Sequence, residues 1–203
     1  MKGIILLNGE PYLGEIDQAD SYVICADGAY NWAKNRVKID ESVGDLDSVE
    51  GEIQPAPSVV YSSEKDQTDG EIALERMLVL RAEGRIDRVE IYGGGGGRED
   101  HFLGNLHLLY RCATSGLPCT LYTNKSMLFA FEKGVMLTGL KGITLSLLPL
   151  GGAVEIEKTT GLKYSADGLT MEYGSCRGIS NEMIDDVAEI VLKSGVALCI
   201  VNG

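Results

Sequence analysis

The sequence predicts an α/β N-terminal domain with a mainly parallel sheet and crossover helices, followed by an all-β sandwich C-terminal domain. In the first part of the chain, short apolar runs alternate with helical patterns, which is typical of a parallel sheet. After about residue 124, strand-length apolar runs follow one another between glycine-rich turns, and no helix of comparable strength interrupts them. This change of period places the domain boundary between residues 1–125 and residues 126–203.

The individual elements follow from the local patterns. In the first domain, short apolar runs predict strands at residues 3–7, 22–26, 58–61, 88–92 and 118–123. A helix is expected over residues 68–84, because Thr68 and Glu71 have the spacing of a capping box and Gly84 closes the pattern. A second helix is expected over residues 100–115, where apolar residues recur at helical spacing. In the second domain, strands are expected at residues 134–137, 143–148, 169–173 and 196–201.

Composition narrows the possible partners. The net charge of −12 argues against nucleic acid or an anionic membrane, because both require a basic surface. The charge permits a nucleotide whose phosphates are masked by metal ions, or a cationic small molecule. No apolar run is long enough to span a bilayer and residues 1–5 lead directly into a strand, so the expected location is the cytoplasm. The five cysteines lack C-x-x-C spacing and are expected to be buried thiols, not zinc ligands.

Acidic residues stand at the ends of several predicted elements. Asp27 ends the second predicted strand, at the edge where open α/β sheets bind ligands, although Asp27-Gly28 is also a common turn. In Gly44-Asp45-Leu46-Asp47-Ser48, two carboxylates at positions i and i+2 of an extended segment point the same way and can ligate one Mg²⁺. The structural alternative is a solvated acidic turn.

A third acidic motif, Asp66-Gln67-Thr68-Asp69, precedes the first predicted helix. An N-cap role for Thr68 and a favourable dipole interaction for Asp69 explain it structurally. A helix N-terminus also binds phosphate, so one site can serve both purposes.

The most informative segment is a run of five glycines, residues 93–97, between a strand and a helix. Such a run marks a place where a ligand approaches the backbone closely, and its N–H groups can form an anion nest. Arg98 follows and can hold phosphate oxygens with two hydrogen bonds. The run lacks the Gly-Lys-Ser/Thr of a Walker A loop, and a flexible loop without function is the alternative. His101 can orient Asp100 or a phosphate, or can serve as a cap, whereas His107 is interpreted as structural.

A parallel sheet would gather these motifs along one edge. Several acids, an arginine and a glycine nest are the groups that phosphoryl-type transfer requires. The residues therefore indicate metal-dependent transfer of a phosphorus group from a nucleotide to a small acceptor.

The order of motifs resembles that of the thiamine pyrophosphokinase family, over nearly the whole chain. The matching segments are Ala26-Asp27-Gly28, Gly44-Asp45-Leu46-Asp47-Ser48, Asp66-Gln67-Thr68-Asp69, Gly96-Gly97-Arg98-Glu99-Asp100-His101 with Asn105, Thr160-Gly161-Leu162-Lys163-Tyr164 and Gly178-Ile179-Ser180-Asn181-Glu182. The resemblance implies a thiamine diphosphokinase, which transfers the intact diphosphate from ATP to the hydroxyl of thiamine and releases AMP. It also implies Mg²⁺ as cofactor and a homodimer with each thiamine pocket at the subunit interface.

The resemblance further assigns roles to residues. The acids expected to hold Mg²⁺ are Asp45, Asp47 and Asp69, with Asp27 beside them. The residues expected at the nucleotide are Gln67, Thr68, Gly96, Gly97 and Arg98, again with Asp27. The candidate catalytic residues are Asp100, Arg98 and Asp69, and among them Asp100 is the candidate to accept or orient the hydroxyl proton. Tyr164, where Trp is frequent, would stack on the cationic thiamine ring, and Thr160, Ser180 and Asn181 would line the same pocket.

Two other functions fit the residues less completely. A different metal-dependent phosphotransferase or nucleotide hydrolase would keep the N-terminal acids but would not need Tyr164 or Asn181. A non-catalytic module would use the acids only to hold a ligand. Recognition of adenine has no clear motif, and Thr123-Asn124 at the end of the fifth predicted strand is only a candidate by position.

Overall fold

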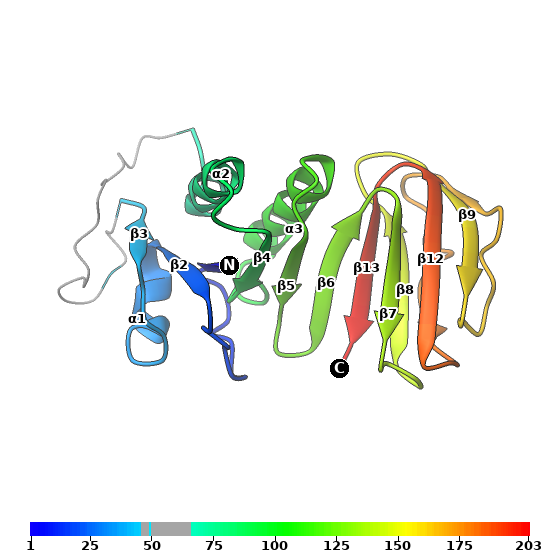
Figure 1. Cartoon of the computed structure of the whole chain (residues 1–203), viewed down its shortest axis with the longest axis horizontal. Coiled ribbons are helices and arrows are strands. Elements are labelled where there is room, and N and C mark those ends of the chain that lie inside the picture. The colour runs from blue at the N-terminus through cyan, green and yellow to red at the C-terminus, as the bar shows by residue number, and fades with distance from the viewer. Residues whose placement is uncertain (46–48, 50–65) are drawn as a thin grey trace. The chain divides into compact units, whose positions relative to one another are not determined.

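The computed structural model describes residues 1–45, 49 and 66–203 (Figure 1). The chain forms two compact units. The first consists of Met1–Leu108 with Leu117–Asn124, and the second of Leu109–Gly116 with Lys125–Gly203. The domain boundary predicted at residue 125 stays a prediction. The segment Leu109–Gly116 belongs to the second unit, although it lies within the predicted first domain.

The first unit is built on a parallel sheet with strand order β5-β4-β1-β2-β3. The strands are β1 (Lys2–Leu6), β2 (Ser21–Ala26), β3 (Glu41–Val43), β4 (Arg88–Tyr92) and β5 (Cys119–Tyr122). Every residue of β1 is buried, as expected for a central strand that is covered on both faces. The predicted parallel sheet is therefore confirmed. The short β3 was not predicted, and the strand expected at residues 58–61 lies outside the described residues.

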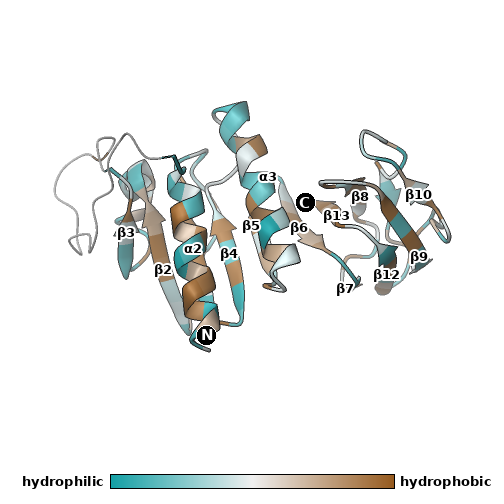
Figure 2. Cartoon of the chain, turned by 90° about the horizontal axis from the view of Figure 1, so that it is seen from above, coloured by the Kyte–Doolittle hydropathy of each residue, from teal (hydrophilic) through white to brown (hydrophobic). Residues whose placement is uncertain are grey.

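Helices pack on both faces of this sheet. Helix α2 (Asp69–Ala82) contacts β1, β2 and β3, and in Figure 2 it lies over the sheet with its axis roughly along the strands. Gly3 makes room for it, because a Cβ at that position would lie 2.5 Å from the sulfur of Met77. On the opposite face, Ile4, Leu6 and Val23 pack in a cluster with residues of the 3₁₀ turn Asp27–Ala29 and of helix α1 (Tyr30–Ala33). Helix α3 (Glu99–Thr114) follows β4 in the chain.

The predicted capping box at the start of α2 is confirmed. The Thr68 hydroxyl accepts a hydrogen bond from the backbone N–H of Glu71 at 3.2 Å, and the Glu71 carboxylate accepts one from the backbone N–H of Thr68 at 2.9 Å. These reciprocal bonds satisfy two N–H groups that the helix itself leaves without partners. The first turn of α2 is thereby fixed in place.

Replacing Thr68 with Ala is expected to lower the free energy of unfolding by about 1 kcal/mol, because the cap hydroxyl is lost. Replacement with Ser, which keeps the hydroxyl and is at least as good an N-cap as Thr, is expected not to lower it. Urea unfolding of the wild type and both variants measures the difference. Equal stability of the Ala and Ser variants would contradict a capping role.

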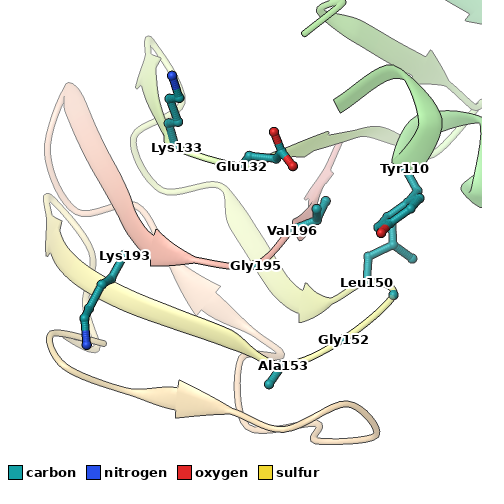
Figure 3. A pocket seen from close by; sticks show the side chains of 10 residues that line it. Tyr110, Glu132, Lys133, Leu150, Gly152, Ala153, Lys193, Gly195 and Val196 are labelled. Atoms are coloured by element: carbon teal, nitrogen blue, oxygen red, sulfur yellow. The ribbon is translucent and has the colours of Figure 1, made fainter. Parts of the chain in front are cut away.

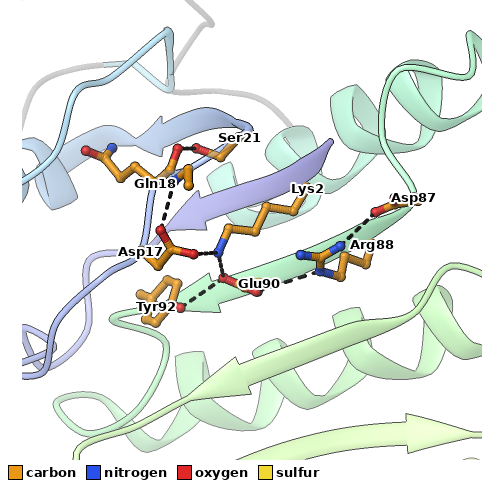
Figure 4. A network of polar contacts seen from close by, with 9 residues as sticks. Lys2, Asp17, Gln18, Ser21, Asp87, Arg88, Glu90 and Tyr92 are labelled. Carbon is orange, nitrogen blue, oxygen red and sulfur yellow. Dashed lines mark hydrogen bonds and ion pairs between the residues drawn. The ribbon is translucent and has the colours of Figure 1, made fainter.

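A buried lysine, Lys2 on β1, pairs with two carboxylates (Figure 4). Lys2 is 4% exposed, and its ammonium lies 3.0 Å from the Glu90 carboxylate and 3.3 Å from that of Asp17. The Tyr92 hydroxyl donates a further hydrogen bond to Glu90 at 3.0 Å. Burial opposes the charge of Lys2, but the bonds and charges of Glu90 and Asp17 outweigh it and raise the pKa of Lys2. The charged form is therefore the one that the fold stabilises.

The second unit is a sandwich of two antiparallel sheets. One has the order β11-β8-β13-β6, with β6 (Ser126–Phe131), β8 (Thr144–Pro149), β11 (Asn181–Glu182) and β13 (Ala197–Asn202). The other has the order β10-β9-β12-β7, with β7 (Gly134–Thr138), β9 (Val154–Thr160), β10 (Thr170–Met171) and β12 (Val187–Ser194). Buried residues of both sheets, such as Leu147 and Ile190, form one core, so the predicted sandwich is confirmed.

Several local predictions need correction. His107, interpreted as structural within the second helix, is exposed. Cys176 is also exposed, whereas Cys25, Cys112, Cys119 and Cys199 are buried, and all five are free thiols. The expected strand at residues 169–173 shortens to β10. Among the described residues, no helix has the length and apolar character needed to cross a membrane.

Candidate active site

The sequence motifs of the first unit come together at the carboxyl edge of its sheet. Asp27 directly follows β2, Gly44 and Asp45 follow β3, and the glycine run follows β4. These strands are parallel, and neighbouring β1 is followed by Leu7-Asn8-Gly9 at the same edge. This is the position at which open α/β sheets bind ligands.

Glycines allow the loops at this edge to touch. A Cβ on Gly9 would lie 2.6 Å from the carbonyl oxygen of Gly93, and one on Gly28 would lie 2.3 Å from the amide nitrogen of Asn8. A Cβ on Gly44 would lie 2.9 Å from that of Asp27. The ends of β4, β1, β2 and β3 therefore form one continuous surface.

Asp27 has a strained backbone. Its φ is 40°, in the left-handed region that few residues other than glycine adopt, and its Oδ1 atom is buried. Strain of this kind is concentrated at functional sites, where the surrounding structure holds it in place. Burial, together with the negative charge of Asp27, raises the pKa of the Cys25 thiol to about 12, which makes Cys25 unsuitable as a nucleophile.

The start of α2 lies at the same edge. A Cβ on Gly70 would lie 3.5 Å from the Leu7 side chain at the end of β1 and 3.7 Å from the Oδ1 atom of Asn105. Asp69 stands in the first turn, where the helix dipole favours a negative charge. The Gln67 side chain donates a hydrogen bond to Glu75 at 2.7 Å, so its amide N–H lies along α2 in this state. Its role at the phosphates stays a prediction.

The glycine run is held in shape by hydrogen bonds to its carbonyls. The carbonyls of Gly93 and Gly95 accept from the backbone N–H groups of Gly9 at 2.8 Å and Glu10 at 2.7 Å. The carbonyl of Gly94 accepts from the Asn105 side chain at 2.8 Å. Positive φ angles at residues 93, 96 and 97 require glycine. Where a left-handed residue stands beside a right-handed one, successive N–H groups can point to one side, as in an anion nest.

Arg98 and Asp100 form a two-point ion pair at the start of α3. The guanidinium donates to the two carboxylate oxygens at 3.1 and 2.6 Å, and both side chains are exposed. The Arg98 hydrogen bond, and that from the backbone N–H of His101, lower the pKa of Asp100 to about 2. A carboxylate with that pKa is a poor proton acceptor near neutral pH. The geometry favours Asp100 as the residue that orients Arg98, and its predicted role at the hydroxyl stays a prediction.

The acids suit a hard divalent cation by donor type. Asp27, Asp45 and Asp69 supply only carboxylate oxygens, which Mg²⁺ prefers. Asp47, the fourth predicted ligand, lies outside the described residues. Within residues 1–45, 49 and 66–203, three or more acidic, histidine or cysteine side chains do not converge tightly enough to hold a metal ion by themselves. Phosphate oxygens and water commonly complete such a Mg²⁺ site.

In the second unit, the structure brings two of the predicted substrate residues together. The Asn181 amide donates to the Tyr164 carbonyl at 2.7 Å and accepts from the Tyr164 backbone N–H at 3.0 Å. The Tyr164 ring is 62% exposed, and the Lys163 ammonium lies 6.0 Å from its centre. Asn181 therefore positions the segment that presents this ring.

The other two predicted substrate residues lie on neighbouring elements. Ser180 has a φ of 62°, and its backbone N–H donates to the Ser146 hydroxyl at 3.1 Å. Thr160 ends β9 and pairs with Glu189 on β12. Neither side chain is brought against Tyr164 by a described hydrogen bond, so their roles stay predictions.

Two family models match the chain in sequence order. The first is described as thiamin pyrophosphokinase, catalytic domain, and matches residues 14–121. The second is described as thiamin pyrophosphokinase, vitamin B1 binding domain, and matches residues 132–197. The chain belongs to the thiamin pyrophosphokinase family.

Relatives of known name span most of the chain. A thiamine pyrophosphokinase of Bacillus subtilis (strain 168) is 31% identical over 79% of this chain and 77% of its own length. A thiamin pyrophosphokinase 1 of Caenorhabditis elegans is 27% identical over 96% of this chain and 86% of its own. The crystal structure of thiamine pyrophosphokinase from Bacillus subtilis superposes with a TM-score of 0.83 at 27% identity, covering 99% and 98% of the two chains.

The second unit has a hollow whose lining contains none of the residues predicted to bind substrates or to act in catalysis (Figure 3). Its volume is about 450 Å³, and its lining includes Tyr110, Glu132 and Val196. The Lys193 side chain extends away from it and pairs with Glu155 at 2.8 Å. The match to the catalytic-domain model covers residues 14–121, and the lining of this hollow lies outside that range except for Tyr110.

Sequence reasoning missed the segment of residues 8–10, although it touches the glycine run. The Asn8-Gly9 dipeptide directly after β1 is a common turn signal and was the available clue. Of the positional candidates for adenine recognition, Asn124 bonds through both ends of its amide to the backbone of the loop after β1. The role of Thr123 and Asn124 at adenine stays a prediction.

Proposed function

We propose that this chain is a thiamine diphosphokinase, which transfers the diphosphate group of ATP to the hydroxyl of thiamine and releases AMP. The observation that carries the proposal is the carboxyl edge of the first unit. There, Asp27, Asp45 and the glycine run lie on adjoining strand ends, in a chain that matches both family models in order. The hydroxyl oxygen of thiamine forms a bond to the β-phosphorus of ATP. The bond between that phosphorus and the oxygen bridging to the α-phosphorus breaks, the bridging oxygen leaves on AMP, and the hydroxyl proton passes to water.

The residues divide this work between them. The glycine nest and the N-terminus of α2 direct N–H groups and a positive dipole end toward phosphates. Arg98 supplies a planar two-donor group for the transferred diphosphate, because Asp100 fixes its orientation. Asp27, Asp45, Asp69 and Asp47 would hold Mg²⁺, which when bound neutralises phosphate charge.

Thiamine binds in the second unit in this proposal. Tyr164 offers an exposed aromatic face to a cationic ring, and the reciprocal bonds of Asn181 hold the segment that carries it. Ser180 and Thr160 line the same pocket. The interaction of an exposed aromatic ring with a ligand is strongest when a second surface excludes water from the ring. This supports a homodimer with the thiamine site at its interface.

The nature of the products tests the reaction. Purified protein with thiamine, ATP and Mg²⁺ is expected to give AMP and thiamine diphosphate in equal amounts, measured by liquid chromatography. Removal of divalent metal with EDTA is expected to abolish turnover, and added Mg²⁺ to restore it. Formation of ADP in place of AMP would instead indicate a different phosphotransferase.

Replacing Tyr164 with Ala is expected to raise the KM for thiamine roughly tenfold, because a cation–π contact is lost. Replacing it with Phe keeps the aromatic face and should change the KM little. The KM for ATP should be unchanged in both variants. A Tyr164→Ala variant with wild-type thiamine kinetics would move the thiamine site elsewhere.

A further inference from the structure

The loop between β1 and β2 supports the glycine run from one side. Residues 8–14 of this loop, here called the β1 loop, leave the sheet beside β4. The backbone N–H groups of Gly9 and Glu10 donate to the carbonyls of Gly93 and Gly95 at 2.8 and 2.7 Å. Because the two carbonyls are held on this side, the position of the glycine run depends on where the β1 loop lies.

The far end of the β1 loop is fixed by Asn124, which lies just beyond β5. Its amide nitrogen donates to the carbonyl of Pro11 at 3.0 Å, and its amide oxygen accepts from the backbone N–H of Leu13 at 2.8 Å. One side chain thus bridges an acceptor and a donor two residues apart. A primary amide supplies that pair of groups, whereas a carboxylate cannot donate to Pro11.

Neighbouring contacts support the same loop. Arg36 donates to the carbonyls of Tyr12 and Gly14, the latter at 2.7 Å. The Tyr12 ring lies 5.0 Å from that of Tyr92, at the end of β4. Beside Asn124, Thr123 touches the glycine run directly, since a Cβ on Gly95 would lie 2.6 Å from its methyl group. The end of β5 therefore contacts both the glycine run and the loop that supports it.

We propose that Asn124 is a positioning residue for the phosphates of the nucleotide, and that it acts through the β1 loop on the glycine run. The inference rests on the proposed function, because it takes the glycine run as the phosphate site. Loss of the Asn124 bridge removes one of the contacts that hold the β1 loop, leaving those of Arg36 and Tyr12. The two N–H groups that hold the carbonyls of Gly93 and Gly95 are then less firmly positioned. The nest then binds phosphates less tightly, whatever base the nucleotide carries.

The test uses the full chain with Asn124 replaced by Asp or by Ala. We expect the KM for ATP to rise roughly tenfold in both variants, the size of one or two lost hydrogen bonds, with the KM for thiamine unchanged. Asn35→Asp is the matched control, because Asn35 is an exposed residue of the same unit and the charge change is identical. Wild-type kinetics for ATP in the Asn124 variants would overturn the proposal.

Tripolyphosphate, which has neither base nor ribose, separates positioning from base recognition. Its inhibition constant against ATP should rise in the Asn124 variants by the same factor as the KM for ATP. An unchanged inhibition constant, with a raised KM for ATP, would show direct contact with the nucleoside and overturn the proposal. If the wild type does not convert thiamine and ATP, the proposed function itself fails, which is a distinct result.

A double substitution tests whether the effect runs through the loop. Gly9→Ala should raise the KM for ATP as well, because its Cβ would press on the carbonyls of Gly93 and Gly95 at 2.6 and 2.7 Å. If Asn124 acts through the same loop, Gly9→Ala with Asn124→Asp should raise the KM by less than the product of the single effects. Multiplicative effects would contradict a shared route.

Discussion

Replacing Asp27 with Asn is expected to lower kcat by at least about a hundredfold, the scale of losing one preorganised electrostatic group at a reaction centre. The free energy of unfolding should change little. Asn tolerates the left-handed backbone nearly as well as Asp, so the φ of 40° is no obstacle to this substitution. The expected fall in kcat therefore comes from the lost charge at the carboxyl edge and not from unfolding. Steady-state kinetics with AMP as the measured product gives kcat.

The chain provides a matched control for this substitution. Asp20 is another aspartate with a positive φ, 49°, but it lies on an exposed turn where its partner is the N-terminal ammonium at 3.7 Å. Asp20→Asn makes the same chemical change in a similar backbone conformation and should leave kcat at the wild-type value. An Asp27→Asn variant as active as Asp20→Asn would remove Asp27 from the active site.

Replacing Glu90 with Gln is expected to lower the free energy of unfolding by about 3 kcal/mol, because the charge of buried Lys2 loses its closer partner. Glu83→Gln is the control, since its ion pair with Arg85 is exposed and should be worth less than about 1 kcal/mol. Urea unfolding at neutral pH measures both. Equal losses in the two variants would contradict a special role for the buried pair.

The pH dependence of stability gives a second measure of the same pair. The pKa of Lys2 is raised in the folded chain above its ordinary value of 10.5, so its contribution is complete below that pH. The contribution is lost as the pH rises through the folded pKa. Wild-type stability should therefore decline in alkali above about pH 10.5, and this decline should be smaller in Glu90→Gln, where less of the Lys2 interaction remains to be lost.

Local patterns predicted the parts of the fold that depend on local chemistry. The capping box of Thr68 and Glu71 involves residues three positions apart, and the structure confirms both of its hydrogen bonds. Five consecutive glycines are costly unless the backbone needs them, and the positive φ angles at residues 93, 96 and 97 confirm that need, whereas ligand binding by the run stays a prediction. By contrast, β3 has only three residues, Glu41–Val43, and one strongly apolar side chain, which is too little pattern to indicate a strand.

Long-range contacts account for most of what the sequence did not predict. Asn124 bonds to Leu13 and Pro11, which lie 111 and 113 positions earlier in the chain. No motif beside Asn124 indicates these bonds. The pairing of Tyr164 with Asn181 likewise depends on the fold of the sandwich. Motifs therefore indicated which residue types carry the chemistry, whereas the contacts that orient them required the structure.

The ion pair between Arg98 and Asp100 leaves part of the guanidinium open to a ligand. Asp100 occupies one edge of the group, through the N–H donors of Nε and Nη2. A guanidinium carries five N–H donors, so its other edge keeps donors for phosphate oxygens while the carboxylate stays in place. Under the proposed function, the diphosphate therefore binds an arginine whose orientation is already fixed, and less side-chain freedom is lost on binding.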